Sequence, residues 1–138
     1  MMIKTEDKTH TTEGTGELPR AERIRVINVS KGTTLATASR KVTGPVERGI
    51  GLIGRKGLEP GSGLIIKPCN SVVSFFMRFT IDVVFVGDGG EVLFVLHEMV
   101  TWRTSRIVRG SRYVVELPAG TAKATNTAIG DRLELSAA

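Results

Sequence analysis

The sequence predicts an α+β domain that is mainly β, with about seven strands and two short helices. The strands are expected in a small antiparallel or mixed sheet, or in a barrel-like form of it. The 138 residues include 16 glycines and 5 prolines, which suit a turn-rich β domain better than a helical bundle. Two apolar runs, Val83–Val86 and Val92–Leu96, flank the turn sequence Gly87–Gly90, as in a β-hairpin. Other segments alternate apolar and polar residues with the period of a strand.

Each expected strand is an apolar run or an alternating segment bounded by turn residues. In the first of them, Ile24 and Val26 face inward. The second is less regular, because Ala36 and Ala38 are weak strand formers. The seven expected strands are 23–29, 33–42, 64–66, 75–86, 91–100, 113–117 and 132–135. The strand 75–86 is expected to bend near Thr80.

Two segments predict short helices. Pro45 suits the first turn of a helix, and Val46, Ile50 and Ile53 then fall on one face at helical spacing. The second helix is expected within 118–124, where proline and alanine suit a first turn.

The first twenty residues are polar and contain almost no apolar side chain after Ile3. Such a segment buries too little surface to offset its ordering entropy, so residues 1–20 are expected to be a disordered tail and 21–138 a single β-rich domain. No run approaches about 18 apolar residues, so no membrane span is expected. No secretory signal is visible and Cys69 is the one cysteine, which together favour a cytoplasmic protein without disulfides.

The net charge of +5 is compatible with anionic partners. Four arginines recur at every third position between two expected strands, and Trp102 and Tyr113 beside them are able to stack on bases. No recognised nucleic-acid motif accompanies the arginines, so a solvated basic face is the favoured interpretation and nucleic acid an unfavoured partner. The four arginines are Arg103, Arg106, Arg109 and Arg112.

Two acidic residues lie within apolar strands. Asp82 shares a strand face with Arg78, while the opposite face of that strand is apolar. A carboxylate there needs a partner, and the candidates are an ion pair with Arg78 or Arg55, backbone amides, or a ligand in a polar pocket. Glu116 shares a face with Val114 and raises the same alternatives, with Arg112 as a further partner. A structural ion pair is favoured over a site in both cases.

Neither a catalytic constellation nor a metal site is indicated. Cys69 and His97 are the cysteine and the histidine of the expected domain, and a metal site needs three or four ligands. No phosphate-binding loop, dinucleotide fingerprint or hydrolase motif is present. The sequence therefore indicates no cofactor and no metal.

Several short segments occur in this order along the chain: Gly51–Arg55, Leu58, Gly63–Ile66, Pro68–Cys69, Phe75–Phe79, Ile81–Phe85, Gly90–Val92, Glu116–Gly120 and Gly130–Asp131. Their order resembles the prokaryotic family known as domain of unknown function 192, over about residues 22–136. The resemblance implies a compact, mainly β domain with little assigned biochemistry, in a family with many exported or membrane-anchored members. The chain has Val73 and Thr80 where members with the Pro-Cys segment tend to have histidine and proline, which argues against Cys–His chemistry here. The characteristic positions that it implies are Arg55, Met77, Arg78, Asp82, Glu116 and Gly120.

Three functional hypotheses follow. The first is a non-enzymatic binding domain in which Arg55, Arg78, Asp82 and Glu116 converge to hold a small anionic ligand or a partner segment. The second is an enzyme that uses Asp82 or Glu116 as acid or base and an arginine as anion holder. The third is nucleic-acid binding through the 103–112 arginine run.

Overall fold

The structure, a computed structural model, describes residues 23–42, 58–71, 79–100 and 103–138. These residues form one seven-stranded sheet and a four-residue helix, which confirms the predicted mainly β fold with its seven strands. The predicted helix from Pro45 and the predicted tail 1–20 lie outside the described residues. The elements are β1 (Arg23–Asn28), β2 (Thr33–Val42), β3 (Ser62–Ile66), β4 (Ile81–Val86), β5 (Val92–Met99), β6 (Tyr113–Pro118), α2 (Thr121–Ala124) and β7 (Leu133–Ala137).

The local sequence signals place most strand limits well. The bounds of β2 are those predicted, and β7 runs two residues farther than expected because Ala137 pairs with Ile24. The first hairpin arm was predicted from Phe75, but β4 begins only at Ile81, and Phe79 lies in a bend. The bend that the sequence predicts near Thr80 is thus confirmed, and the part of this arm before Phe79 lies outside the described residues.

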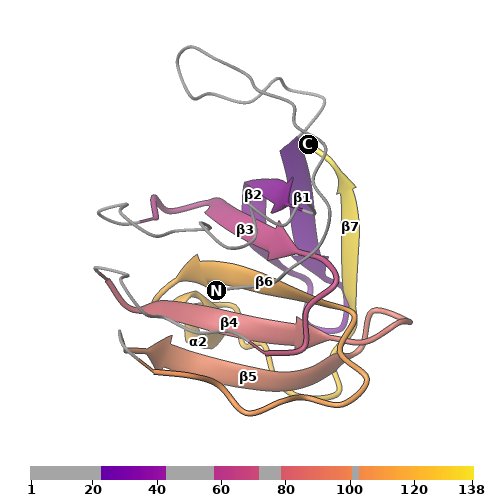
Figure 1. Ribbon diagram of the computed structural model, residues 1–138. Coiled ribbons are helices and arrows are strands. Elements are labelled where there is room, and N and C mark those ends of the chain that lie inside the picture. The colour runs from indigo at the N-terminus through magenta and orange to yellow at the C-terminus, as the bar shows by residue number, and fades with distance from the viewer. Residues whose placement is uncertain (1–22, 43–57, 72–78, 101–102) are drawn as a thin grey trace, which may run out of the picture.

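The strands lie in the order β5-β4-β6-β3-β2-β1-β7. All neighbours are antiparallel except β2 and β3, which are parallel. In Figure 1, β1 and β7 stand steeply to β4, β5 and β6, so the sheet is strongly curled. The sheet is thus mixed and barrel-like.

The curl brings the two outermost strands together at one corner. The amide of Val92 donates to the carbonyl oxygen of Asp131 at 2.8 Å, and the amide of Gly130 donates to the carbonyl oxygen of Val92 at 2.9 Å. A third bond, 2.7 Å long, runs from the Leu133 amide to the carbonyl oxygen of Gly90. These bonds join the start of β5 to the start of β7 and partly close the barrel.

Each face of the sheet has its own apolar core. The inner core contains residues from all seven strands, among them Val26, Val84 and Leu133. The outer core is formed by β2 to β6 and the connecting segments, among them Val83 and Val108. Every residue of β4 is buried, so this strand packs on both faces. Since burial of one such side chain stabilises a fold by roughly 1.5–3 kcal/mol, both cores contribute substantially.

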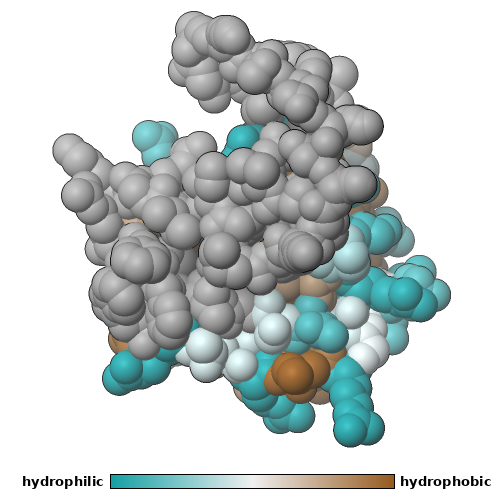
Figure 2. All heavy atoms as spheres, viewed as in Figure 1, coloured by the Kyte–Doolittle hydropathy of each residue, from teal (hydrophilic) through white to brown (hydrophobic). Residues whose placement is uncertain are grey.

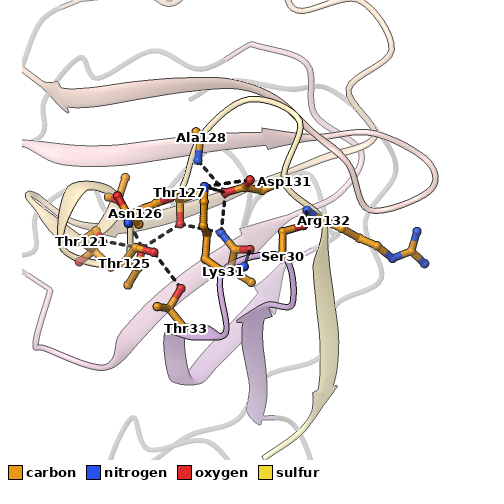
Figure 3. Close-up of polar contacts among 12 residues, drawn as sticks. Ser30, Lys31, Thr33, Thr121, Thr125, Asn126, Thr127, Ala128, Asp131 and Arg132 are labelled. Carbon is orange, nitrogen blue, oxygen red and sulfur yellow. Dashed lines mark hydrogen bonds and ion pairs between the residues drawn. The ribbon is translucent and has the colours of Figure 1, made fainter.

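A polar network behind the closed corner ties the β1–β2 turn to the loop before β7 (Figure 3). The Asp131 carboxylate accepts hydrogen bonds from Asn28 Nδ2, from Lys31 Nζ and from the amide of Ala128, all at about 2.9 Å. The side-chain bonds from Asn28 and Lys31 lower the pKa of Asp131 below its usual range. The stabilisation from this carboxylate is therefore present at neutral pH and is lost as the pH falls through its lowered pKa.

The closed corner requires glycine at position 90. Gly90 has φ +91°, and a Cβ atom built on it would lie 2.6 Å from the carbonyl oxygen of Leu133. We expect Gly90→Ala to destabilise the domain by about 2 kcal/mol or more in urea unfolding, because the left-handed conformation and the contact with backbone both cost energy. Gly89→Ala is the matched control, since its nearest neighbour is the flexible end of the Glu91 side chain. Equal losses for the two variants would contradict this account of the corner.

Candidate functional site

Asp82, on β4, is fully buried and binds backbone amides from two distant segments. Its Oδ1 accepts from the Glu98 amide at 2.8 Å, and its Oδ2 accepts from the amides of Gly120 at 3.1 Å and Ala122 at 2.8 Å. Of the alternatives that the sequence allows for this carboxylate, satisfaction by backbone amides is therefore the one observed. The other predicted partners, Arg55 and Arg78, lie outside the described residues.

A bulge in β5 brings one of these donors to Asp82. Ile81 pairs with Met99 and Val83 with Leu96, so β5 has one extra residue at this point. Glu98, inside the bulge, has φ +48°. A bulge changes the direction of the backbone groups next to it. This bulge directs the Glu98 amide toward the carboxylate.

The other two donors belong to the start of α2. Gly120 precedes the helix with φ +93° and has no side chain with which to cap it. The carboxylate of Asp82 binds the free amides of this first turn instead, which is the role that an N-cap side chain normally has. Asp82 thus fixes the end of β6 and the beginning of α2 against β4.

Glu116 lies on the opposite face of the sheet from Asp82. On β4 and β6, Val83 is paired with Glu116 and Asp82 with Leu117, and directly paired residues share a face. The side chain of Asp82 therefore belongs to the inner face and that of Glu116 to the outer face. The prediction that these two carboxyl groups converge in one site is wrong.

The described residues paired with Glu116 are apolar. Its cross-strand neighbours are Leu64 and Val83, it is 1% exposed, and neither carboxyl oxygen has a hydrogen-bond partner among the described residues. Burial raises the pKa of Glu116 to about 8, so this group is mostly protonated at neutral pH. Arg112, one of its predicted partners, lies instead 3.7 Å from Asp88 on the surface.

The arginine run extends along β5 in the chain that connects β5 to β6 (Figure 1). All four of its arginines are exposed, as predicted for a solvated basic face. The guanidinium carbon of Arg106 lies 5.1 Å from the centre of the Phe94 ring.

Tyr113 is only 8% exposed and belongs to the inner core. Its burial raises its pKa to about 12, with a smaller contribution from the charge of Glu91. The prediction that Tyr113 stacks on bases is therefore wrong, and Trp102 lies outside the described residues.

The remaining reactive side chains do not form a site in the part of the chain that the structure describes. Cys69 is buried, and its thiol lies 3.1 Å from the carbonyl oxygen of Ser71, to which it donates. His97 is exposed on β5. Within the described ranges no three His, Cys, Asp or Glu side chains are grouped to hold a metal ion, and no helix there is long and apolar enough to span a membrane.

An open hollow of about 440 Å³ lies beside α2. Its volume is within the range of about 300–1,000 Å³ that is typical of ligand pockets. Among the described residues its lining has no charged side chain. Sequence reasoning missed the hollow because the lining residues come from three separate segments. These are Thr34–Thr37 of β2, Pro60–Gly61 before β3, and Pro118–Thr121 with Ala124.

A surface with scattered apolar residues surrounds these features. The described part of the face in Figure 2 is largely hydrophilic, with apolar surface in small patches. Ile107, within the arginine run, is 66% exposed, and Ile129 is 64% exposed. Single exposed apolar residues of this kind are common on proteins, so the hollow is the more specific feature.

Comparison with known proteins identifies the family. A family model for DUF192, described as an uncharacterised ACR, matches residues 26–135. The chain belongs to the domain of unknown function 192 family. It is 35% identical over 115 residues to the UPF0127 protein PF1050 of Pyrococcus furiosus, a match that covers 79% of this chain and 96% of that protein.

Two crystal structures show the same DUF192 fold. One, from Sinorhizobium meliloti, is described as a candidate transcription regulator; it has a TM-score of 0.71 and 28% identity, with 89% of this chain and 100% of that chain covered. The other, from Novosphingobium aromaticivorans, is a protein of unknown function with a TM-score of 0.71 and 19% identity. That match covers 87% of this chain and 99% of the other.

The structure gives a physical reason for two positions that the DUF192 resemblance implies. Asp82 and Gly120 are hydrogen-bonded to each other through the Gly120 amide. A residue with a side chain would adopt φ +93° only with strain, and the carboxylate needs this amide as a donor. In this DUF192 domain the two residues form one structural unit.

The first test concerns Asp82. We expect Asp82→Asn to lower the free energy of unfolding by about 3 kcal/mol, because an amide group has one acceptor oxygen and turns an N–H₂ toward backbone donors. Urea unfolding measures the loss. Asp88→Asn is the control, since that side chain is 85% exposed, and a similar loss in both variants would refute the structural role of Asp82.

The second test concerns Glu116. Because its folded-state pKa of about 8 is above the ordinary value of 4.5, the folded domain binds a proton that the unfolded chain has already lost between these two pH values. Stability therefore falls as the pH rises from 4.5 to 8, by at most about 1.4 kcal/mol per pH unit. We expect Glu116→Gln to remove most of this slope in unfolding curves measured across the window.

The exposed Glu134→Gln variant should keep the wild-type slope, since Glu134 lies on the surface of β7. A slope in Glu116→Gln as steep as that of the wild type would show that Glu116 does not cause it.

Proposed function

We propose that this DUF192 domain is a non-enzymatic binding domain that holds an uncharged partner segment in the hollow between β2 and α2. The observation that carries the proposal is the hollow itself, with a volume of about 440 Å³ and no charged side chain among the described residues that line it. Threonine hydroxyls, prolines and small residues line it, and they offer apolar contact with a few hydrogen bonds. Such a lining is typical of sites that recognise neutral groups.

The electrostatics favour a neutral occupant over the small anion that the sequence first suggested. The amide of Gly120, which lines the hollow, and that of the buried Ala122 behind it already donate to the Asp82 carboxylate. They are therefore not available to an anion, and the Asp82 carboxylate behind the wall repels one. Asp82 has a positioning role here, because it fixes the wall without touching the occupant.

The separation of the two acidic residues supports a non-enzymatic role. An acid–base mechanism needs its groups within hydrogen-bonding reach of one substrate. Asp82 and Glu116 lie on opposite faces of the sheet, and all contacts of Asp82 named above are to backbone amides. Neither residue lines the hollow.

Substitution of a lining residue by tryptophan tests whether the hollow is the binding site. Ala124 lines the hollow and is exposed, whereas the adjacent Lys123 is exposed but does not line it. In nuclear magnetic resonance titrations with N-acetylvaline methylamide, we expect shifts at Thr34–Thr37 and Pro118–Ala124 for the wild type and for Lys123→Trp. Ala124→Trp should weaken binding by about tenfold or more, because the indole ring occupies the space.

Shifts confined to other parts of the domain, or equal binding by Ala124→Trp, would contradict the proposed site. Ala119→Trp, at a second exposed lining position, provides an independent blocking variant.

The arginine run supports a second candidate function, which is binding of a nucleic acid. Four exposed arginines on one extended segment suit a polyanion better than a small ligand, and the Sinorhizobium meliloti relative, at 28% identity, is described as a candidate transcription regulator. Arg106 is partly engaged by Phe94 and Arg112 by Asp88. Both side chains remain exposed and accessible to phosphates.

A gel-shift titration with duplex DNA at increasing salt tests this function. We expect replacement of all four arginines by glutamine to weaken binding and to make the dependence of log K on log salt shallower, since each lost phosphate contact removes a slope of about 0.9. The charge-matched control replaces four exposed cations elsewhere by glutamine: Arg25, Lys41, Lys67 and Lys123. Equal weakening in both variants, or no shift of the wild type at low salt, would exclude a specific role for the run.

A further inference from the structure

The hollow lies where the sheet lacks part of a strand. β2 begins at Thr33, but its partner β3 begins only at Ser62, which is opposite Ala38. The residues of β2 from Thr33 to Thr37 thus extend past the N-terminal start of β3. On this side they have no neighbouring strand among the residues that the structure describes.

The space of the missing part of the strand has two walls and is closed at one end. β3 lies between β2 and β6 in the sheet. If β3 were extended in the N-terminal direction from Ser62, it would run between Thr34–Thr37 and the end of β6. Pro118–Thr121 and Ala124 form the second wall. The chain turns away at Pro60–Gly61, where the Ser62 amide donates to the carbonyl oxygen of Glu59. We call this space the β3 slot.

The β3 slot has the dimensions of a short extended peptide. Neighbouring strands in a sheet are about 4.8 Å apart, and next to the slot β2 and β6 are separated by the one strand β3. The four residues Thr34–Thr37 correspond to a length of about 13 Å at about 3.3 Å per residue. The Thr37 amide already donates to the carbonyl oxygen of Gly61 at 2.9 Å, and this bond marks the closed end of the slot.

We propose that the β3 slot receives an extended, uncharged peptide segment of another protein, which pairs with the edge of β2 as a continuation of β3. The inference rests on the proposed function and specifies its partner. An extended peptide supplies main-chain donors and acceptors to an uncovered strand edge, which is an established mode of peptide recognition. The uncharged lining, backed by the Asp82 carboxylate, selects a segment without acidic side chains.

Strand pairing has a signature that distinguishes it from recognition of side chains alone. In an extended peptide, successive N–H groups point to opposite sides, so only alternate amides of the bound segment face β2. Methylation of those nitrogens removes donors and adds bulk at the interface. Methylation of the other nitrogens, which face the wall formed by Pro118–Thr121 and Ala124, removes no hydrogen bond to β2.

The experiment uses the blocked pentapeptide Thr-Val-Thr-Val-Thr and two analogues, one N-methylated at the odd positions and the other at the even positions. Binding to the full chain is followed by nuclear magnetic resonance. We expect the parent peptide to shift the resonances of Thr34–Thr37, and one analogue to bind at least about tenfold more weakly than the other, as loss of two or more hydrogen bonds implies. Ala124→Trp and Ala119→Trp should both block the parent peptide, and Lys123→Trp should not.

Equal affinities of the two analogues, with binding still blocked by Ala124→Trp, would overturn strand pairing and leave the proposed binding function intact. Shifts away from the slot would also overturn it. If neither the pentapeptide nor N-acetylvaline methylamide shifts the resonances of the hollow, the proposed function itself fails.

Discussion

The arrangement of this domain depends on one carboxylate, that of Asp82, and on the three amides that it binds. They come from the bulge of β5 and from the first turn of α2, segments that do not otherwise share a strand pairing. The carboxylate holds the short helix against the barrel and so positions one wall of the hollow. Asp131 has a similar role at the closed corner, where it binds Asn28, Lys31 and the Ala128 amide. Among the described residues, these acidic groups stabilise the fold through nitrogen donors of turns, a strand end and a β-bulge.

Asp82 and Glu116 show what sequence patterns reveal about a buried charge. The period-two alternation correctly assigned each residue to a strand face shared with its apolar neighbours. It left open whether the two faces were the same, because that depends on the register between β4 and β6. It also left open which groups donate hydrogen bonds to each carboxyl group. Backbone amides are possible donors in every protein, so the sequence alone does not show where they are used. As a result, two similar patterns have different outcomes, one carboxylate with three donors and one protonated carboxyl group in an apolar environment.

The fold shows the same division between local and long-range information. Turn residues and apolar runs predicted β2, the central hairpin and β6 closely, because these signals lie within a few residues. The parallel pairing of β2 with β3 and the contact of β5 with β7 join distant segments, and no local pattern encodes them. The hollow follows from the unequal lengths of β2 and β3, a difference that has meaning only once the two strands are known to be neighbours.

The pairing of β1 with β7 also has a consequence for biosynthesis. About a hundred residues separate the end of β1 from the start of β7, and ribosomes add roughly 5–20 residues per second. For roughly 5–20 s after its synthesis, β1 therefore has β2 as its only partner strand, and Val26, which is fully buried in the folded domain, lacks much of its surroundings. During this interval the nascent chain presents an uncovered strand edge beside apolar residues, which is the kind of surface that chaperones protect from aggregation.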